Sequence, residues 1–144
     1  MKLSFTLLAT IGMFFSCNSL ASDLNITENS EVLDCISKYG EENAECFSNL
    51  NEKTERKLIL SFDSKLTQIS NFDYEKWWMG SQEQKEDMIS SFKKNQNEWK
   101  IYRNDYCQIA STAAENTHSY AGSMLSCIIN MNKKRIDEIN MINP

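Results

Sequence analysis

Proline and glycine are scarce in this chain, and their scarcity restricts the fold. The only proline is Pro144, the last residue, and Gly40, Gly80 and Gly122 are the only glycines after residue 21. Sheets and barrels usually need many more turn-forming residues than this. The three glycines also separate segments of helical periodicity. We therefore predict an all-α fold, a small bundle of three main helices plus a short N-terminal helix.

Histidine is scarce too, which limits the chemistry that the chain can perform. His118 is the only histidine, and no glycine-rich phosphate loop is present. No Ser-His-Asp or Cys-His set can be identified. The cysteines lack the close Cys-x-x-Cys or Cys/His spacing that zinc sites prefer. We expect no enzymatic activity, no metal and no cofactor.

The apolar run at the N-terminus is too short to cross a bilayer. Leu3–Phe15 has 13 residues, whereas a spanning helix needs about 20. Lys2 precedes the run, and Ser19-Leu20-Ala21 places small residues where a signal peptidase cleaves. Residues 1–21 are therefore predicted to be a signal peptide, and 22–144 a single exported domain, periplasmic or secreted.

Cys17 offers a second interpretation of the leader. Ser16-Cys17 has the small residue and the cysteine of a lipid-attachment site, although the bulky Phe14 and Phe15 fit such a site poorly. The chain is then a lipoprotein anchored at Cys17, and otherwise we expect no stable membrane insertion. Under both interpretations Cys17 is unavailable for a disulfide, because it is either cleaved off or acylated.

The charge balance is acidic. The formal net charge is −5, and loss of Lys2 with the leader makes it −6. Such a surface argues against nucleic acid and anionic membranes and favours a basic partner. Small domains commonly carry a charge of this size for solubility alone, so charge by itself identifies no partner.

The first part of the domain is predicted to hold a short helix over 30–38 and a helix of about 25–30 residues that starts in the acidic run Glu41-Glu42. The apolar stripe of the longer helix has steps of three or four residues. It comprises Phe47, Leu50, Leu58, Phe62, Leu66 and Ile69, with Thr54 filling one place.

The second part is predicted to hold two more helices. One starts at the N-cap Ser81, with Gln84 as its capping-box partner, and ends near Ala110. Its stripe comprises Met88, Phe92, Gln96, Trp99, Arg103 and Tyr106. The last helix starts near Ala121 and buries Leu125, Ile128, Ile129, Ile136 and Ile139.

Between these parts, Tyr74–Trp78 is predicted to form a short aromatic helix or turn. Its Trp77-Trp78 pair could stack on a sugar or lie on a membrane surface, but such pairs more often cover the end of a helical core.

Four cysteines in an exported domain imply two disulfides. Pairing between sequence neighbours is the most economical choice, and it joins Cys35 to Cys46 and Cys107 to Cys127. Each bond closes a short loop and contributes about 3 kcal/mol in the chain-entropy model. The other two connectivities remain open.

These cysteines belong to a longer pattern. Cys35 and Cys46 precede a long helix, and Gln96-x-x-Trp99-x-x-Tyr102-Arg103-x-x-x-Cys107, Gly122-Ser123-x-x-x-Cys127 and Arg135-x-x-x-Ile139 follow. Together, over about residues 33–140, they resemble the LprI-type lysozyme inhibitor family, small exported bacterial helical domains with paired cysteines. The chain departs from the family's usual residues at Asn104, where the family has Asp, and at Asn132, where it has Thr. Leu58 and Phe62 meet its Leu and Tyr positions loosely.

The polar and aromatic members of this pattern are predicted to be scaffold. A fold tolerates an arginine on a buried apolar stripe only when a carboxylate or carbonyl groups pair with its charge. A tryptophan there is an anchor of the core. We assign this structural role to Gln96, Trp99, Tyr102, Arg103 and Arg135.

The resemblance implies binding and inhibition of a basic, lysozyme-type glycan hydrolase, toward which an acidic protein is steered. The loop Ser111–Tyr120 is our candidate inhibitory segment, because a disulfide at its base would pre-organise it. Its hydrogen-bonding residues are Glu115, His118, Ser119 and Tyr120. The alternative is a plain connector. Two other functions remain open: a periplasmic structural or adaptor protein, and an immunity protein against a cell-wall-degrading toxin.

Overall fold

A computed structural model describes residues 25–76 and 80–143. This part of the chain contains helices and no strand, so the all-α prediction is confirmed for it. The helices are α1 (Ser30–Tyr39), α2 (Ala44–Asn71), α3 (Gln82–Ala110) and α4 (Tyr120–Met141), with the 3-10 turns η1 (Tyr74–Lys76) and η2 (Thr112–Ala114). The predictions for the signal peptide, for Cys17 and for the Trp77-Trp78 pair fall outside the described residues.

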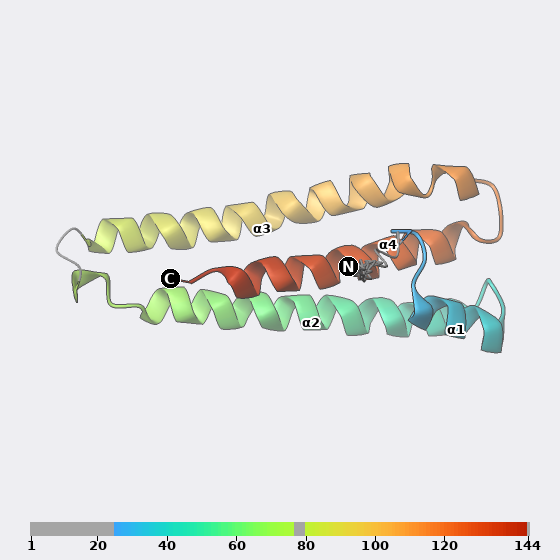
Figure 1. Ribbon diagram of the computed structural model, residues 1–144, viewed down its shortest axis with the longest axis horizontal. Helices are drawn as coiled ribbons and strands as arrows, with labels where there is room; N and C mark the ends of the chain where they lie inside the picture. Colours follow the sequence, from blue (N-terminus) through green and yellow to red (C-terminus); the bar gives the residue numbers. More distant parts are fainter. Residues whose placement is uncertain (1–24, 77–79, 144) are drawn as a thin grey trace, which may run out of the picture.

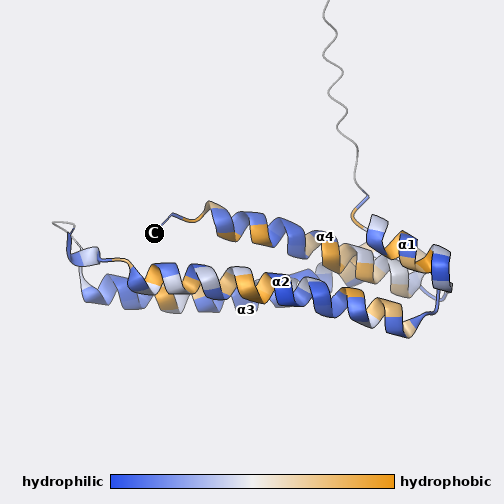
Figure 2. Cartoon of the chain, turned by 90° about the horizontal axis from the view of Figure 1, so that it is seen from below, coloured by the Kyte–Doolittle hydropathy of each residue, from blue (hydrophilic) through white to orange (hydrophobic). Residues whose placement is uncertain are grey.

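The three long helices lie side by side along the length of the molecule, and α1 packs against α2 and α4 at one end (Figure 1). Each of α2, α3 and α4 contacts the other two. Apolar and polar residues alternate along each long helix (Figure 2), which is the pattern of helices that bury one face and expose the other.

Three apolar clusters hold these helices together. The first joins all three long helices through Leu58, Ile69, Phe92 and Ile139, and there the rings of Phe62 and Phe92 stack with centroids 4.7 Å apart. The second joins α1 to α4 through Val32, Leu125 and Ile129. The third surrounds Cys107, Cys127 and Met131. The core therefore runs along the whole length of the long helices.

The start of α2 differs from the prediction. Its N-cap is Asn43, whose side chain accepts a hydrogen bond from the backbone N–H of Cys46 at 2.8 Å. Glu41 and Glu42 lie in the turn before the helix and do not open it. An asparagine oxygen satisfies an otherwise unpaired helix N–H directly, which outweighs the weaker attraction of nearby acids to the helix dipole.

The start of α3 is as predicted. The Ser81 hydroxyl accepts from the Gln84 N–H at 3.2 Å, and the Gln84 side chain accepts from the Ser81 N–H at 3.0 Å. The predicted stripe is wrong at its two ends, because Met88 and Tyr106 are 39% and 37% exposed. Tyr106 directly precedes Cys107, which is 0% exposed, so other helices do cover this part of α3 and the Tyr106 side chain lies outside the covered face.

The last helix approaches α1 closely at Gly122. A Cβ atom at this position would lie 3.0 Å from the terminal methyl of Ile36 and 3.7 Å from Val32. The absence of a side chain therefore allows α4 and α1 to pack tightly. The helix begins at Tyr120, one residue before the predicted start, so Tyr120 belongs to α4 and not to the preceding loop.

Candidate functional site

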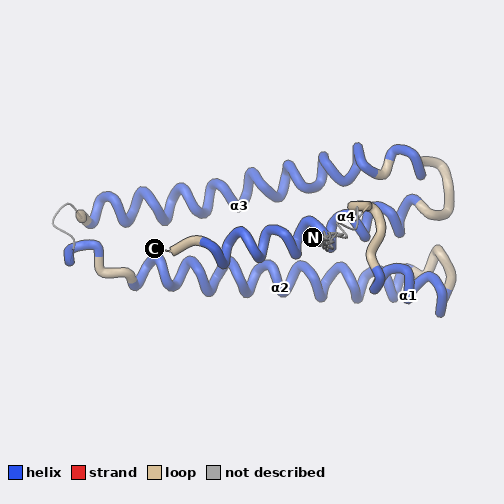
Figure 3. Tube along the Cα trace, in the orientation of Figure 1, coloured by secondary structure: helices blue, strands red, loops and turns tan. Residues whose placement is uncertain are grey.

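Both disulfides lie at the same end of the molecule. Cys35 bonds Cys46 and joins α1 to α2, and Cys107 bonds Cys127 and joins α3 to α4. The local pairing that we considered most economical is therefore the one found. The two loops that these bonds brace, between α1 and α2 and between α3 and α4, are at this same end (Figure 3). We call it the disulfide end.

The loop between α3 and α4 is shaped by its own backbone. Hydrogen bonds run from Ala114 N–H to Ser111 O and from Thr117 N–H to Ala114 O. Asn116 adopts a left-handed conformation with φ 64°, which asparagine tolerates better than most residues. The hydroxyls of Thr117 and Ser119 are 2.8 Å apart. These local turns give the loop a defined course from one helix to the next.

Most of the predicted recognition residues are open to solvent. Glu115, His118 and Ser119 are exposed, whereas Tyr120 is half-buried in the first turn of α4. At the base of the loop, Ser111 is buried, and its backbone N–H donates to the carbonyl oxygen of Cys107 at 3.0 Å. The loop therefore presents a carboxylate, an imidazole and a hydroxyl from a fixed base.

His118 connects this loop to the other one. Its Nδ1 atom contacts a carboxylate oxygen of Glu42, which lies in the turn between α1 and α2. The hydrogen bond that His118 donates to Glu42, followed by the charge of that carboxylate, raises the pKa of His118, and the charge of Glu41 adds to the effect. Two segments 76 residues apart in the sequence thus meet at one surface.

The surface around this contact is acidic. Glu41, Glu42, Glu45 and Glu115 are all exposed there, with Lys38 as the nearby cation at the end of α1. An open groove of about 410 Å³ lies alongside. Its lining residues are Tyr39, Asn43, Glu45, Cys46, Asn49, Leu50 and Lys53. The disulfide end therefore presents exposed carboxylates beside an open groove.

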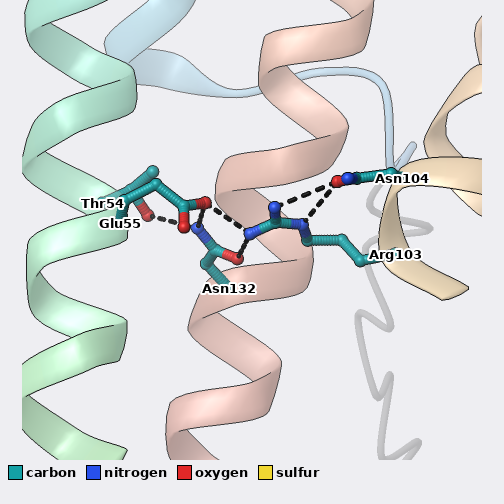
Figure 4. A network of polar contacts seen from close by, with 5 residues as sticks. All are labelled: Thr54, Glu55, Arg103, Asn104 and Asn132. Carbon is teal, nitrogen blue, oxygen red and sulfur yellow. Dashed lines mark hydrogen bonds and ion pairs between the residues drawn. The ribbon is translucent and has the colours of Figure 1, made fainter. Parts of the chain in front are cut away.

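Beneath this end, a buried network fixes Arg103 (Figure 4). Its guanidinium pairs with Glu55 of α2 and donates to the Asn132 side chain of α4 at 2.6 Å. It also donates to Asn104 at 3.1 and 3.0 Å. Asn132 in turn donates to Glu55 at 3.0 Å and to Thr54 at 3.4 Å. One arginine therefore links all three long helices.

Arg135 has a second set of partners. It donates to Gln96 at 3.0 Å and to Glu138 at 2.9 Å, and it also bonds Asn95. Gln96 is buried and Arg135 is 9% exposed. Among the described residues the structure thus places Gln96, Arg103 and Arg135 in the interior, each with hydrogen-bond partners.

Tyr102 differs from these residues. Its side chain is 55% exposed, and its ring contacts that of Tyr106 at 5.8 Å between centroids. The scaffold role predicted for Tyr102 therefore has no support from burial. Helical geometry explains the difference, because the residue beside Arg103 in sequence points about 100° away from it around the helix.

The comparison with protein-family models identifies the relationship. The model described as lysozyme inhibitor LprI matches residues 35–139. This chain belongs to the LprI lysozyme inhibitor family. The matched range begins at Cys35 and ends at Ile139, so it includes both disulfides, the Arg103 and Arg135 networks and the loop between α3 and α4. No match was found among curated proteins or solved structures.

Sequence reasoning missed several partners in this LprI protein. Glu55, Asn95 and Asn132 satisfy the two buried arginines. Glu55 and Asn95 were not singled out from the sequence, and Asn132 was noted only as a departure from the family's usual residue. One signal was present: Thr54 interrupts the apolar stripe of α2, and Glu55 follows it. A polar break in a stripe is where a buried polar network can enter.

The described residues of this LprI protein hold no cluster of three or more His, Cys, Asp or Glu side chains arranged to hold a metal ion. Within the same ranges, none of the helices combines the length and the apolar character that a bilayer crossing requires.

Proposed function

We propose that this LprI-family protein is exported and binds and inhibits a lysozyme-like muramidase. The family match over residues 35–139 is the observation that carries the proposal. The acidic surface supports it, because lysozymes of the type inhibited by the family are basic. The chain has a formal net charge of −5, which favours encounter with such an enzyme.

The disulfide end is the proposed contact surface. Both of its loops are braced by a disulfide, and the His118–Glu42 contact links them at the surface. A pre-organised loop loses less conformational entropy on binding than a free one. Glu115, His118 and Ser119 supply hydrogen-bonding groups, and the target's active-site cleft, which contains two catalytic carboxyl groups, is the proposed place of contact.

Export is proposed to follow from the leader at residues 1–21, with a lipid anchor at Cys17 as the alternative. Mass measurement of the protein recovered from its natural compartment separates the two. A chain that begins at Ser22 indicates cleavage after Ala21, whereas a chain that begins at an acylated Cys17 indicates a lipoprotein.

The test of the proposed function uses purified residues 22–144 with both disulfides formed. Inhibition and binding are measured against C-type, G-type and phage-type lysozymes at several salt concentrations. We expect inhibition of at least one type, with affinity that falls as salt rises. Inhibition of none of them would overturn the proposal, and protection against a wall-degrading toxin alone would point to an immunity protein.

The role of the acidic surface can be tested with matched variants. Glu41→Gln/Glu45→Gln/Glu115→Gln neutralises three carboxylates at the disulfide end. Glu83→Gln/Glu86→Gln/Asp87→Asn neutralises three near the start of α3, at the opposite end (Figure 1). Both variants change the net charge equally. We expect the first to lower the association rate about ten-fold and the second to change it about two-fold or less. Equal effects would mean that net charge alone steers binding.

The loop itself needs a separate variant. Glu115→Ala/His118→Ala/Ser119→Ala removes its exposed polar groups and leaves Cys107–Cys127 and α4 in place. We expect weaker inhibition, with slower association from the lost charge of Glu115 and faster dissociation from the lost hydrogen-bonding groups. Unchanged inhibition would reduce the loop to a connector, while the proposed function of the protein would stand.

A further inference from the structure

Three exposed apolar side chains share one face of α3 close to the disulfide end. Tyr102, Tyr106 and Ile109 are 55%, 37% and 73% exposed. Their spacing of four and three residues places them on the same side of the helix. The two tyrosine rings are in contact, with centroids 5.8 Å apart and planes inclined by 38°. We call these three residues the tyrosine stripe.

The fold does not require this stripe. Arg103 and Cys107 alternate with it in sequence and point into the core, where they are 7% and 0% exposed. The stripe is therefore rotated away from the helices that α3 contacts. Singly exposed apolar residues are ordinary, but three on one face within two turns form a contiguous patch of the kind that marks interaction surfaces.

Acidic residues flank the stripe. Glu98 lies four residues before Tyr102, and Asp105 lies four residues before Ile109, so both share its side of the helix. Both are exposed, and Glu98 has a long contact of 3.8 Å with Lys94. The loop that carries Glu115 begins directly after α3 ends at Ala110. The stripe is thus an apolar strip with carboxylates beside it on the same helix, and it lies on the part of α3 that leads into the disulfide end.

We infer that the tyrosine stripe is the apolar centre of the surface that binds a basic glycan hydrolase, with the acidic disulfide end as its rim. This inference rests on the proposed function and adds to it the side chains that provide the binding energy. Interfaces combine an apolar, aromatic-rich centre with a polar rim, and tyrosine is among the residues that most often dominate their energy. The flanking carboxylates select a basic partner by charge complementarity.

Tyrosines suit this role for a further reason. Each presents a large, rigid, amphipathic surface with only two side-chain torsions to fix on binding, so the entropy cost per contact is small. The mutual contact of Tyr102 and Tyr106 restricts both rings before the partner arrives. Their hydroxyls can hydrogen-bond in a polar, sugar-binding cleft while their rings cover its apolar parts.

The stripe and the rim then act on different rates. Charges at the edge of an interface mainly alter association and its dependence on salt, whereas well-packed central side chains mainly alter dissociation. Measuring both rates therefore distinguishes the contribution of the stripe from that of the protein's overall acidic charge.

The test compares two double variants of residues 22–144. Tyr102→Ala/Ile109→Ala removes the two most exposed members of the stripe. Leu60→Ala/Met141→Ala is the matched control, because these side chains are 63% and 71% exposed and lie on α2 and α4. All four positions are exposed and alanine favours helix, so both variants are expected to fold. Circular dichroism and thermal unfolding check this.

Binding to the inhibited lysozyme is measured by surface plasmon resonance. We expect the stripe variant to bind at least ten-fold more weakly, through faster dissociation with a nearly unchanged association rate, and the control to stay within about two-fold of the original chain. If the original chain binds and both variants match it, the inference is overturned and the proposed function stands. If the original chain binds no lysozyme, both the proposed function and this inference are overturned.

Discussion

Arg103 and Arg135 direct their guanidinium groups to the same indole ring, that of Trp99, at 5.5 and 5.4 Å from the ring centroid. One arginine belongs to α3 and the other to α4. Each also has an acidic partner, Glu55 for Arg103 and Glu138 for Arg135. The face of the Trp99 ring is therefore attracted to two cationic groups in a partly buried region.

The first prediction concerns this ring. Trp99→Phe keeps an aromatic face for the two guanidinium groups, whereas Trp99→Leu has a side chain of roughly similar size to Phe without one. We expect the leucine variant to be about 1–2 kcal/mol less stable than the phenylalanine variant, because it loses the cation–π attraction of two desolvated arginines. Urea unfolding of both variants under identical conditions measures this difference. Equal stabilities would show that Trp99 acts by volume alone.

The second prediction concerns the ion pair between Arg103 and Glu55. Glu55→Ala leaves the guanidinium, 8% exposed as a side chain, without its carboxylate. Breaking an enclosed pair costs about 3–5 kcal/mol. We expect about 2–3 kcal/mol here, because the Glu55 side chain is 26% exposed and solvent screens part of the interaction.

The control is Glu52→Ala, an exposed glutamate on the same helix, for which we expect a change of about 0.5 kcal/mol or less. A double variant with Arg103→Met should recover part of the loss, since no unpaired charge then remains buried. Strict additivity of the two single changes would contradict a direct coupling between Arg103 and Glu55.

Local features of this fold could be predicted and long-range ones could not. The capping box at Ser81 and Gln84 depends on four adjacent residues, so the sequence contains all of it. The partners of Arg103 lie 48 and 29 residues away in Glu55 and Asn132. The sequence predicts that a buried arginine has partners, because its charge must be satisfied. Which residues these partners are depends on the positions of the three helices relative to one another along their axes.

The candidate site shows the same limit. Asn104 and Asn132, the two positions that depart from the usual family residues, both hydrogen-bond Arg103, and a single sequence does not show that they share one partner. Tyr102 illustrates a different limit. Because Tyr102 is part of the motif, we predicted a structural role for it. The motif gives only the spacing between residues, and it does not say which residues face the core and which face solvent. The His118–Glu42 contact joins two loops, and loop geometry follows no periodicity.

The third prediction concerns the order in which the disulfides are reduced. Both sulfur-bearing residues of the Cys107–Cys127 bond are 0% exposed, whereas Cys46 is only partly buried. Thiol–disulfide exchange requires access to a sulfur atom. Under mild reductant we expect Cys35 and Cys46 to be alkylated first, as shown by peptide mass spectrometry. Removal of either bond by paired serine substitutions should cost about 3 kcal/mol. Faster alkylation of Cys107 and Cys127 would contradict this order.

The fourth prediction concerns the pH dependence of the His118–Glu42 contact. The pKa of His118 is raised from its ordinary value, first by the hydrogen bond with Glu42 and then by the charge of that carboxylate. A raised pKa means that the folded state holds the proton more tightly than the unfolded state does. The stabilising contribution is therefore fully present below pH 6.5, the ordinary value, and is lost as the pH rises through the raised pKa. Titration of the imidazole followed by NMR measures that pKa directly.

Matched variants in the same turn separate the causes of this shift. Glu42→Gln removes both the charge-assisted hydrogen bond and the nearest charge, so the pKa of His118 should fall toward its ordinary value. Glu41→Gln removes only a smaller, through-space effect of charge and should lower the pKa less. Because the side chains of His118 and Glu42 are 79% and 74% exposed, the shift should also shrink as salt is added. If Glu41→Gln lowered the pKa as much as Glu42→Gln, general acidity of the turn would account for the shift, and the two loops would not be held together by this contact.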